Sequence, residues 1–182
     1  MRIALEEGGS IAGVPDGILH SFAEPKPGVL DEVAELRAMG VKIGSTTGYN
    51  DKMMAIVAPA AKAAGYAPDF MITPDSVGGK GRPFPYMMFR NMEALGATSV
   101  NEVVKVGDTV SDVLEGLAAG VFTVAVVEGS SEMAMTQEEF EALDANAQDE
   151  ACERVAAKFR AAGAHAVIRI MDELPALIRQ LA

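Results

Sequence analysis

The stretch at residues 102–112, Glu-Val-Val-Lys-Val-Gly-Asp-Thr-Val-Ser-Asp, constrains the fold of this chain more than any other. Its first half is rich in β-branched residues and its second half begins a helical pattern, so it predicts a strand, a turn and a helix. Asp108 then lies at the carboxyl end of a parallel strand, and Asp112 follows one helical turn later. Both carboxylates are expected to point into the crevice at which open α/β sheets bind ligands.

The Asp108 and Asp112 pair allows two interpretations. Two acidic groups this close repel each other unless a cation lies beside them, and Mg²⁺ prefers oxygen ligands, so the pair is typical of a metal site. Alternatively, Asp108 caps the helix and Asp112 is a solvated acid of the first turn, favoured there by the helix dipole. The residues alone leave both interpretations open.

Helical and strand patterns alternate along most of the chain. The predicted helices cover residues 27–39, 51–64, 86–95, 110–119, 137–147, 150–162 and 171–181, and the predicted strands cover 41–46, 70–72, 103–106, 122–127 and 166–170. This alternation predicts an α/β fold, with a parallel sheet and helices on both faces. Residues 1–24 are an irregular N-terminal segment with many turn signals, and residues 25–182 are expected to form one core domain.

The composition excludes several functional classes. The formal net charge of -11 argues against nucleic-acid binding, which needs a basic face, so an anionic substrate must be received by local positive groups. No apolar run is long enough to span a bilayer, which predicts a soluble protein with no membrane partner. The N-terminus lacks the apolar core of a signal peptide, so we expect a cytoplasmic protein.

Two further segments carry polar groups that could bind a phosphate. Gly44–Tyr49 combines small residues with the hydroxyls of Ser45, Thr46 and Thr47, and such segments let backbone and hydroxyl donors approach an anion. An ordinary helix cap explains the same residues. Gly79–Pro85 carries Arg82 among residues that stiffen the chain, so it could present a fixed guanidinium, although most exposed arginines only solvate a loop.

The order of these signals is more specific than any one of them. A strand-end Thr, then a loop cation, then Gly-Asp-x-x-x-Asp resembles the second, third and fourth motifs of the haloacid dehalogenase (HAD) superfamily. The match is closer to its phosphonoacetaldehyde hydrolase (phosphonatase) family, and it extends from about Pro27 to the C-terminus. The similar segments are Lys42–Tyr49, Thr73–Asp75, Gly81–Pro85, Lys105–Asp112 and Glu128–Ser131.

The resemblance implies a HAD-like Rossmannoid core and hydrolysis of the carbon–phosphorus bond of phosphonoacetaldehyde, with Mg²⁺, in a homodimer. By motif position, Thr47, Gly48, Tyr49 and Arg82 would bind the small phosphonate or phosphorylated substrate. Thr47, Arg82 and Asp112 would also serve catalysis, with Asp108 as the metal ligand and Asp112 supporting it. Positioning and charge neutralisation by the metal and Arg82 are what phosphoryl transfer requires.

The sequence also departs from the family. The nucleophile motif, an apolar strand followed by Asp-Trp-Ala-Gly-Thr, is absent from these 182 residues. The helical cap domain, which carries a Schiff-base lysine in the family, is also expected to be absent. None of the lysines is assigned that role: they are Lys26, Lys42, Lys52, Lys62, Lys80, Lys105 and Lys158.

Two explanations of this departure compete. The chain is a fragment whose first 24 residues are the tail of the cap, in which case the sheet lacks its central strand. Alternatively, Arg2–Ser10 replaces the first strand and its loop, with Glu6 in place of the nucleophilic Asp. The second explanation predicts a capless phosphatase that uses Glu6, and the alternative to catalysis is a phosphate-binding or subunit-interaction module. In either case we expect this chain alone to hydrolyse little phosphonoacetaldehyde.

Overall fold

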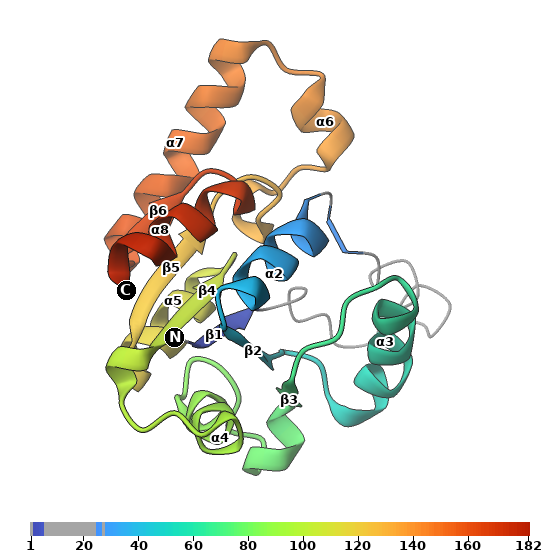
Figure 1. Cartoon of the computed structure of the whole chain (residues 1–182). Helices are drawn as coiled ribbons and strands as arrows, with labels where there is room; N and C mark the ends of the chain where they lie inside the picture. Colours follow the sequence, from blue (N-terminus) through green and yellow to red (C-terminus); the bar gives the residue numbers. More distant parts are fainter. Residues whose placement is uncertain (1, 6–24, 27) are drawn as a thin grey trace.

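A computed structural model describes residues 2–5, 25–26 and 28–182, with side chains from residue 25 onward. Its sheet has six parallel strands in the order β3-β2-β1-β4-β5-β6 (Figure 1). The strands are β1 Arg2–Leu5, β2 Lys42–Thr46, β3 Phe70–Ile72, β4 Val103–Gly107, β5 Phe122–Val126 and β6 Ala166–Ile168. The predicted α/β class with a parallel sheet is therefore confirmed.

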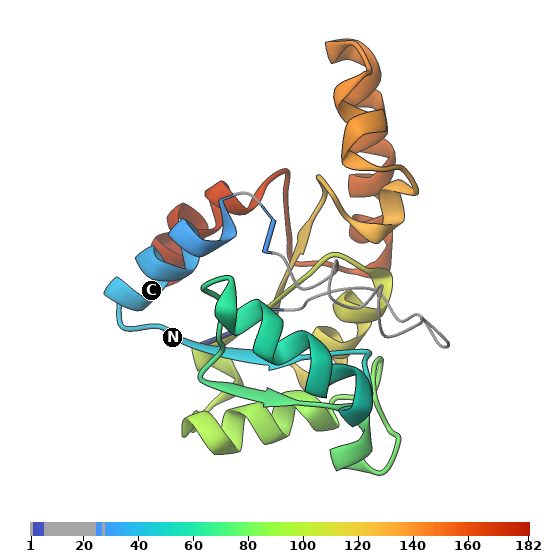
Figure 2. The same cartoon turned by 90° about the vertical axis from the view of Figure 1, so that its right-hand side faces the viewer.

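Helices cover both faces of the sheet, as βαβ crossovers require. The α-helices are α2 Val29–Ala38, α3 Asp51–Ala63, α4 Tyr86–Leu95, α5 Val110–Ala119, α6 Gln137–Glu141, α7 Ala145–Ala162 and α8 Leu174–Leu181. Short 3₁₀ turns lie at η2 Pro74–Val77, η3 Val100–Glu102, η4 Ser131–Met133 and η5 Met171–Glu173. Helices α2 and α8 share one core cluster with β2, β4 and β5, whereas α5 and α7 pack together on the opposite face (Figure 2).

Strand β1 occupies the middle of the sheet. Its Ile3 is in register with Ile43 of β2 on one side and with Val104 of β4 on the other. Thus residues 2–5, from the segment predicted as irregular or as a substitute first strand, lie between β2 and β4. Glu6 and Ser10, which follow β1 in the chain, lie outside the described residues, so the role predicted for Glu6 stays a prediction.

The boundary between two predicted helices differs in the structure. The pattern predicted helices at 137–147 and 150–162, but α6 ends at Glu141 and α7 begins at Ala145. The reason is local, because the carboxylate of Asp144 accepts a hydrogen bond from the Ala147 backbone N–H (2.9 Å) and starts a new helix there. Helix α6 and the start of α7 project from the sheet as an arm, whereas the rest of α7 packs on the sheet (Figures 1 and 2).

Among the described residues, no helix combines the length and the hydrophobicity that a membrane span requires.

Candidate active site

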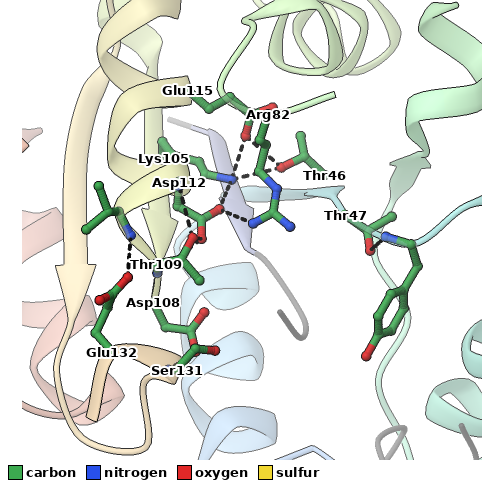
Figure 3. Close-up of polar contacts among 12 residues, drawn as sticks. Thr46, Thr47, Arg82, Lys105, Asp108, Thr109, Asp112, Glu115, Ser131 and Glu132 are labelled. Atoms are coloured by element: carbon green, nitrogen blue, oxygen red, sulfur yellow. Dashed lines mark hydrogen bonds and ion pairs between the residues drawn. The ribbon is translucent and has the colours of Figure 1, made fainter. Parts of the chain in front are cut away.

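The carboxyl ends of β2 and β4 bring together side chains from four separate segments (Figure 3). Thr46 ends β2, Asp108 follows β4, Asp112 lies in the first turn of α5, and Arg82 comes from the loop between η2 and α4. Arg82 and Asp112 are thirty residues apart in the sequence, yet they form an ion pair. The fold thus brings the loop cation next to the Gly-Asp-x-x-x-Asp segment.

Local capping fixes one carboxylate oxygen of Asp112. The Thr109 hydroxyl accepts a hydrogen bond from the Asp112 backbone N–H (3.1 Å), while Asp112 Oδ2 accepts from the Thr109 backbone N–H (3.2 Å). The Thr109 hydroxyl also donates to Asp112 Oδ2 (2.5 Å). This is a capping box with Asp at its third position. Asp112 is fully buried, so the interpretation of it as a solvated acid is wrong, and Thr109 rather than Asp108 caps α5.

The other oxygen of Asp112 binds two cations. Arg82 Nη1 donates to Asp112 Oδ1 at 3.0 Å, and Lys105 Nζ lies 2.8 Å from the same oxygen. The Arg82 side chain is only 6% exposed and that of Asp112 is 1% exposed, so solvent screens this pair weakly. Arg82 is therefore held by a buried carboxylate at the carboxyl edge of the sheet, which fixes the direction of its guanidinium group.

Lys105 connects Asp112 to a second buried acid. Its ammonium group lies 2.8 Å from Glu115 Oε2 and donates to Thr46 Oγ1 at 2.8 Å. The Thr46 hydroxyl in turn donates to Glu115 Oε2 at 3.0 Å. Lys105, Thr46 and Glu115 are completely buried. The formal charges of Arg82, Lys105, Asp112 and Glu115 cancel, as a buried ionic cluster requires, because an uncompensated interior charge is costly.

Sequence reasoning assigned no role to Lys105 or Glu115, and it gave the Thr46 hydroxyl only a possible contact with phosphate. A signal was present for Lys105, because the run Val-Val-Lys-Val-Gly places one charged residue in an otherwise apolar strand. All five residues of β4 are buried, so such a lysine must find an acidic partner inside the protein. The identity of that partner depends on how closely α5 packs against β4.

Two glycines permit that close packing. A Cβ on Gly116 of α5 would lie 3.0 Å from Lys105 Cβ and 2.4 Å from Thr123 Oγ1. A Cβ on Gly107 would lie 2.3 Å from Asp112 Cβ. Real Cβ atoms do not approach other atoms so closely, and a close-packed interior has no room to move them apart. Glycine at both positions therefore lets the helix bring Asp112 and Glu115 to Lys105.

Asp108 has a different environment. Its Oδ2 accepts a hydrogen bond from the Ser131 backbone N–H (3.3 Å) and lies 3.8 Å from Lys26 Nζ. Its Oδ1 is buried and has no hydrogen-bond partner among the described residues. Burial raises the pKa of the Asp108 carboxyl above its usual value, and Asp112 adds to the rise, whereas Lys26, the Ser131 N–H and Arg82 oppose it.

This environment fits a divalent cation at Asp108. An orphaned, buried carboxylate oxygen is a ready ligand, and Mg²⁺ is commonly bound through one or two carboxylates with several waters. The described residues contain no cluster of three or more His, Cys, Asp or Glu side chains that could hold a metal. Both oxygens of Asp112 already accept hydrogen bonds. Asp112 would therefore support such a site by holding Arg82 and Thr109 in place, rather than by ligating the ion.

The predicted substrate-binding residues Thr47, Gly48 and Tyr49 follow β2. Thr47 is buried and its hydroxyl accepts a hydrogen bond from the Tyr49 backbone N–H (3.0 Å), which stabilises the turn. Tyr49 is buried in a small core cluster with residues of α3. In Figure 3, Thr47 lies apart from the group around Asp112, and the preceding residue, Thr46, belongs to that group. Phosphate binding by Thr47, Gly48 and Tyr49 stays a prediction.

Comparison with known proteins identifies the family. Residues 5–120 match the haloacid dehalogenase-like hydrolases. The chain belongs to this family of hydrolases. Curated phosphonoacetaldehyde hydrolases are similar over 90% of the chain: that of Lysinibacillus sphaericus (strain C3-41) is 51% identical and that of Parabacteroides distasonis 47% identical. The predicted resemblance to phosphonoacetaldehyde hydrolases is thus confirmed.

The solved structures agree with this assignment. A phosphonoacetaldehyde hydrolase-like protein from Oleispira antarctica is 33% identical and aligns over 91% of the chain with a TM-score of 0.87. The chain covers 60% of that protein, and it covers 61% of each of the two curated relatives. It therefore spans about three fifths of the length of these three relatives.

Proposed function

We propose that the chain acts in the hydrolysis of phosphonoacetaldehyde to acetaldehyde and phosphate, and that it supplies the phosphate- and metal-binding part of the site. The observation that carries this proposal is the buried Arg82–Asp112 ion pair beside Asp108, whose Oδ1 has no hydrogen-bond partner among the described residues. The proposed substrate, a small phosphonate, is supported by the names of the relatives. About half of their aligned residues are identical to those of this chain.

Each residue of the site has a chemical task in this proposal. The Arg82 guanidinium neutralises and orients phosphoryl oxygens, a task for which its planar set of donors is suited. Asp112 holds Arg82 in place. Mg²⁺, which Asp108 would hold, supplies further neutralisation of the phosphoryl group. Preorganised charge of this kind accounts for most of the catalysis in phosphoryl transfer.

The nucleophile is the part that these residues do not supply. Glu6 directly follows β1, the central strand of the sheet, and this position in the chain favours it as a substitute nucleophile. A glutamate carries its carboxylate one methylene further out than an aspartate, and about 1 Å of misplacement can cost roughly 100-fold in rate. We therefore propose a slow phosphatase that uses Glu6 as the second candidate function, and little phosphonatase activity for this chain alone.

Phosphorus NMR tests the proposal directly. Folded wild-type chain is incubated with phosphonoacetaldehyde and Mg²⁺, and the spectrum is followed for conversion of the phosphonate signal to inorganic phosphate. Slow conversion that is lost in Glu6→Ala and Arg82→Ala, but not in the exposed control Arg37→Ala, supports catalysis by this site. Conversion that survives Glu6→Ala excludes Glu6 as the nucleophile.

Phosphate binding separates the remaining alternatives. Calorimetric titration with inorganic phosphate in the presence of Mg²⁺ is expected to show saturable binding that Arg82→Ala weakens by at least tenfold, or about 1.4 kcal/mol. Binding without turnover of phosphonoacetaldehyde or p-nitrophenyl phosphate supports the non-catalytic phosphate-binding module. If the folded chain binds no phosphate, both the proposed function and the binding module are wrong.

We further propose that the protein works in the cytoplasm as a homodimer, without nucleic-acid or membrane partners. The net charge of -11 supports the absence of a nucleic-acid partner, because a polyanion would be repelled.

A further inference from the structure

Two carboxylates from separate elements meet at the start of α2. Glu32 lies in the first turn of α2, and Asp172 lies in η5, shortly before α8. A Cβ atom on Gly28, the residue before α2, would lie 3.2 Å from Asp172 Oδ1 and 3.3 Å from both Glu32 Oε1 and Glu32 Oε2. Three carboxylate oxygens from two side chains therefore converge on one point beside the Gly28 backbone.

The Glu32 carboxylate is buried with one oxygen unpaired. Glu32 is only 8% exposed, and its Oε2 has no hydrogen-bond partner among the described residues. Burial raises the pKa of the Glu32 carboxyl, and the neighbouring charges of Asp172 and Asp31 are negative and raise it further. Ionised carboxylates are rarely buried without a compensating partner. Glu32 and Asp172 therefore need either a shared proton or a cation between them.

A second contact between the same elements shows the usual way to join them. Helices α2 and α8 lie side by side (Figures 1 and 2), and Glu35 of α2 forms an ion pair with Arg179 of α8. Opposite charges thus join the helices at Glu35, whereas like charges meet one turn earlier at Glu32 and Asp172. In the described part of the chain, no Lys or Arg side chain forms an ion pair with either of these two acids.

The arrangement of the oxygens favours Ca²⁺. Both oxygens of Glu32 lie at the same distance from the point of convergence, as the oxygens of a bidentate carboxylate do. Ca²⁺ accepts bidentate carboxylates and six to eight oxygen ligands in irregular geometry, whereas Mg²⁺ requires a nearly ideal octahedron. Gly28 and Asp172 are exposed, so water can complete the coordination from the solvent side.

We infer that Glu32 and Asp172 form a Ca²⁺-binding site that joins the start of α2 to η5. The ion compensates the buried charge of Glu32 and links α2 to the segment that leads into α8. It thereby stabilises the layer that these two helices form on one face of the sheet. The inference concerns stability and takes no part in the proposed catalysis, so either one can fail without the other.

Thermal denaturation with and without Ca²⁺ tests the site. Asp108→Asn is the parent chain for this test, because it removes the carboxylate proposed to hold Mg²⁺. After treatment with EDTA and dialysis, the melting temperature of the parent should rise with added Ca²⁺ and then saturate. At ten times the Kd, the ion favours the folded state about elevenfold, which corresponds to a rise of about 3–6 °C. Two carboxylates with water predict a Kd of about 0.1–1 mM.

Glu32→Gln and Asp172→Asn, each added to the parent, should abolish the rise. Glu32→Gln should also reverse its effect: without Ca²⁺ it should be at least as stable as the parent, and with saturating Ca²⁺ it should be less stable. A loss of packing alone would not change sign. Glu35→Gln is the matched control on the same helix, because its partner is Arg179; it should respond to Ca²⁺ as the parent does.

Two outcomes overturn the inference. If the melting temperature of the parent does not respond to Ca²⁺ up to about 10 mM, a shared proton rather than a cation links the two acids. If the response persists in Asp172→Asn, the ion binds elsewhere. Calorimetric titration of the same variants with CaCl₂ should agree, with one site in the parent and none in Asp172→Asn.

Discussion

Asp108 and Asp112 lie one helical turn apart, yet the fold surrounds them with different groups. Asp112 is fully buried, and both of its oxygens accept hydrogen bonds, from Thr109 on one side and from the cations Arg82 and Lys105 on the other. Asp108 is partly exposed, and its Oδ1 has no hydrogen-bond partner in the described part of the chain.

The comparison shows that the supply of donors, rather than the residue type, separates two carboxylates. A carboxylate whose oxygens are all occupied positions its neighbours and adds to the stability of the fold. A carboxylate with an unpaired buried oxygen is desolvated without a compensating hydrogen bond, and it is available to a cation. On this basis we propose that Asp112 supports the site and that Asp108 is the metal ligand.

Removing the charge of Lys105, which contacts Asp112, should have the largest effect on stability. Lys105→Met keeps the length of the side chain but leaves Asp112 and Glu115 with excess buried negative charge. We expect the free energy of unfolding to fall by about 3–5 kcal/mol, measured by urea denaturation. The double variant Lys105→Met/Glu115→Gln removes one charge of each sign and should recover part of the loss. Unchanged stability in Lys105→Met would show that the buried cluster contributes nothing.

Matched amide variants compare the two aspartates directly. Asp112→Asn leaves Arg82 and Lys105 facing a neutral group and should cost about 2–3 kcal/mol of stability. Asp108→Asn removes a carboxylate whose burial already disfavours its charge, so stability should be unchanged or slightly higher.

Metal binding should reverse the order of the two variants, with Asp108→Asn affected more than Asp112→Asn. Titration with Mn²⁺, followed by its paramagnetic resonance signal, should show a loss of at least tenfold in affinity for Asp108→Asn. The affinity of folded Asp112→Asn should change less. If the effects are reversed, the roles assigned to Asp108 and Asp112 are wrong.

A single methyl group at Gly107 should disturb the close packing of α5 against β4, which gives Asp112 its buried environment. In Gly107→Ala the new Cβ would lie 2.3 Å from Asp112 Cβ, so α5 must shift away from β4. Overpacking of this kind typically costs about 1–3 kcal/mol, and thermal denaturation would measure it. Gly40→Ala is the control: its Cβ meets nothing within 4 Å, so any loss there reports only its positive φ of 80°.

The smallest effect on stability is expected at Glu32, a buried acid of α2 that is far from Asp108 and Asp112 in the sequence. Burial raises the pKa of Glu32 above its usual value of 4.5, a hydrogen bond from its backbone N–H opposes the rise, and Asp172 and Asp31 add to it. The ionised form therefore destabilises the folded state. Glu32→Gln should be more stable than the wild type at pH 7, by less than about 1 kcal/mol.

The sign of this effect gives its pH dependence. As the pH falls through the raised pKa of Glu32, the wild type takes up a proton in the folded state and the advantage of Glu32→Gln declines, until it vanishes below about 4.5, the usual value. Denaturation curves between pH 4 and pH 7, on the scale of ordinary acid titrations, would measure this trend. Glu150→Gln, at an exposed position of α7, is the control. A constant difference across this range would contradict the assignment.

Much of the architecture could be predicted from the sequence because it depends on local patterns. The predicted α5 and α4 match the structure, and β2 and β4 differ from prediction by one residue at an end, since apolar periodicity and terminal glycines define them. The helix boundary between α6 and α7 was missed because a single side chain, Asp144, caps α7 inside a polar stretch that has no strong period.

The candidate site shows the same division. The sequence by itself determined the order of motifs, the turn that carries Asp108 and the position of Asp112 one turn later, because these depend on neighbouring residues. Only the tertiary structure decided that Lys105 reaches Thr46, fifty-nine residues away, and that Asp112 has no oxygen left for a metal. The physical reason is that burial and hydrogen-bond partners depend on how closely α5, β4 and the Arg82 loop pack, which no local pattern encodes.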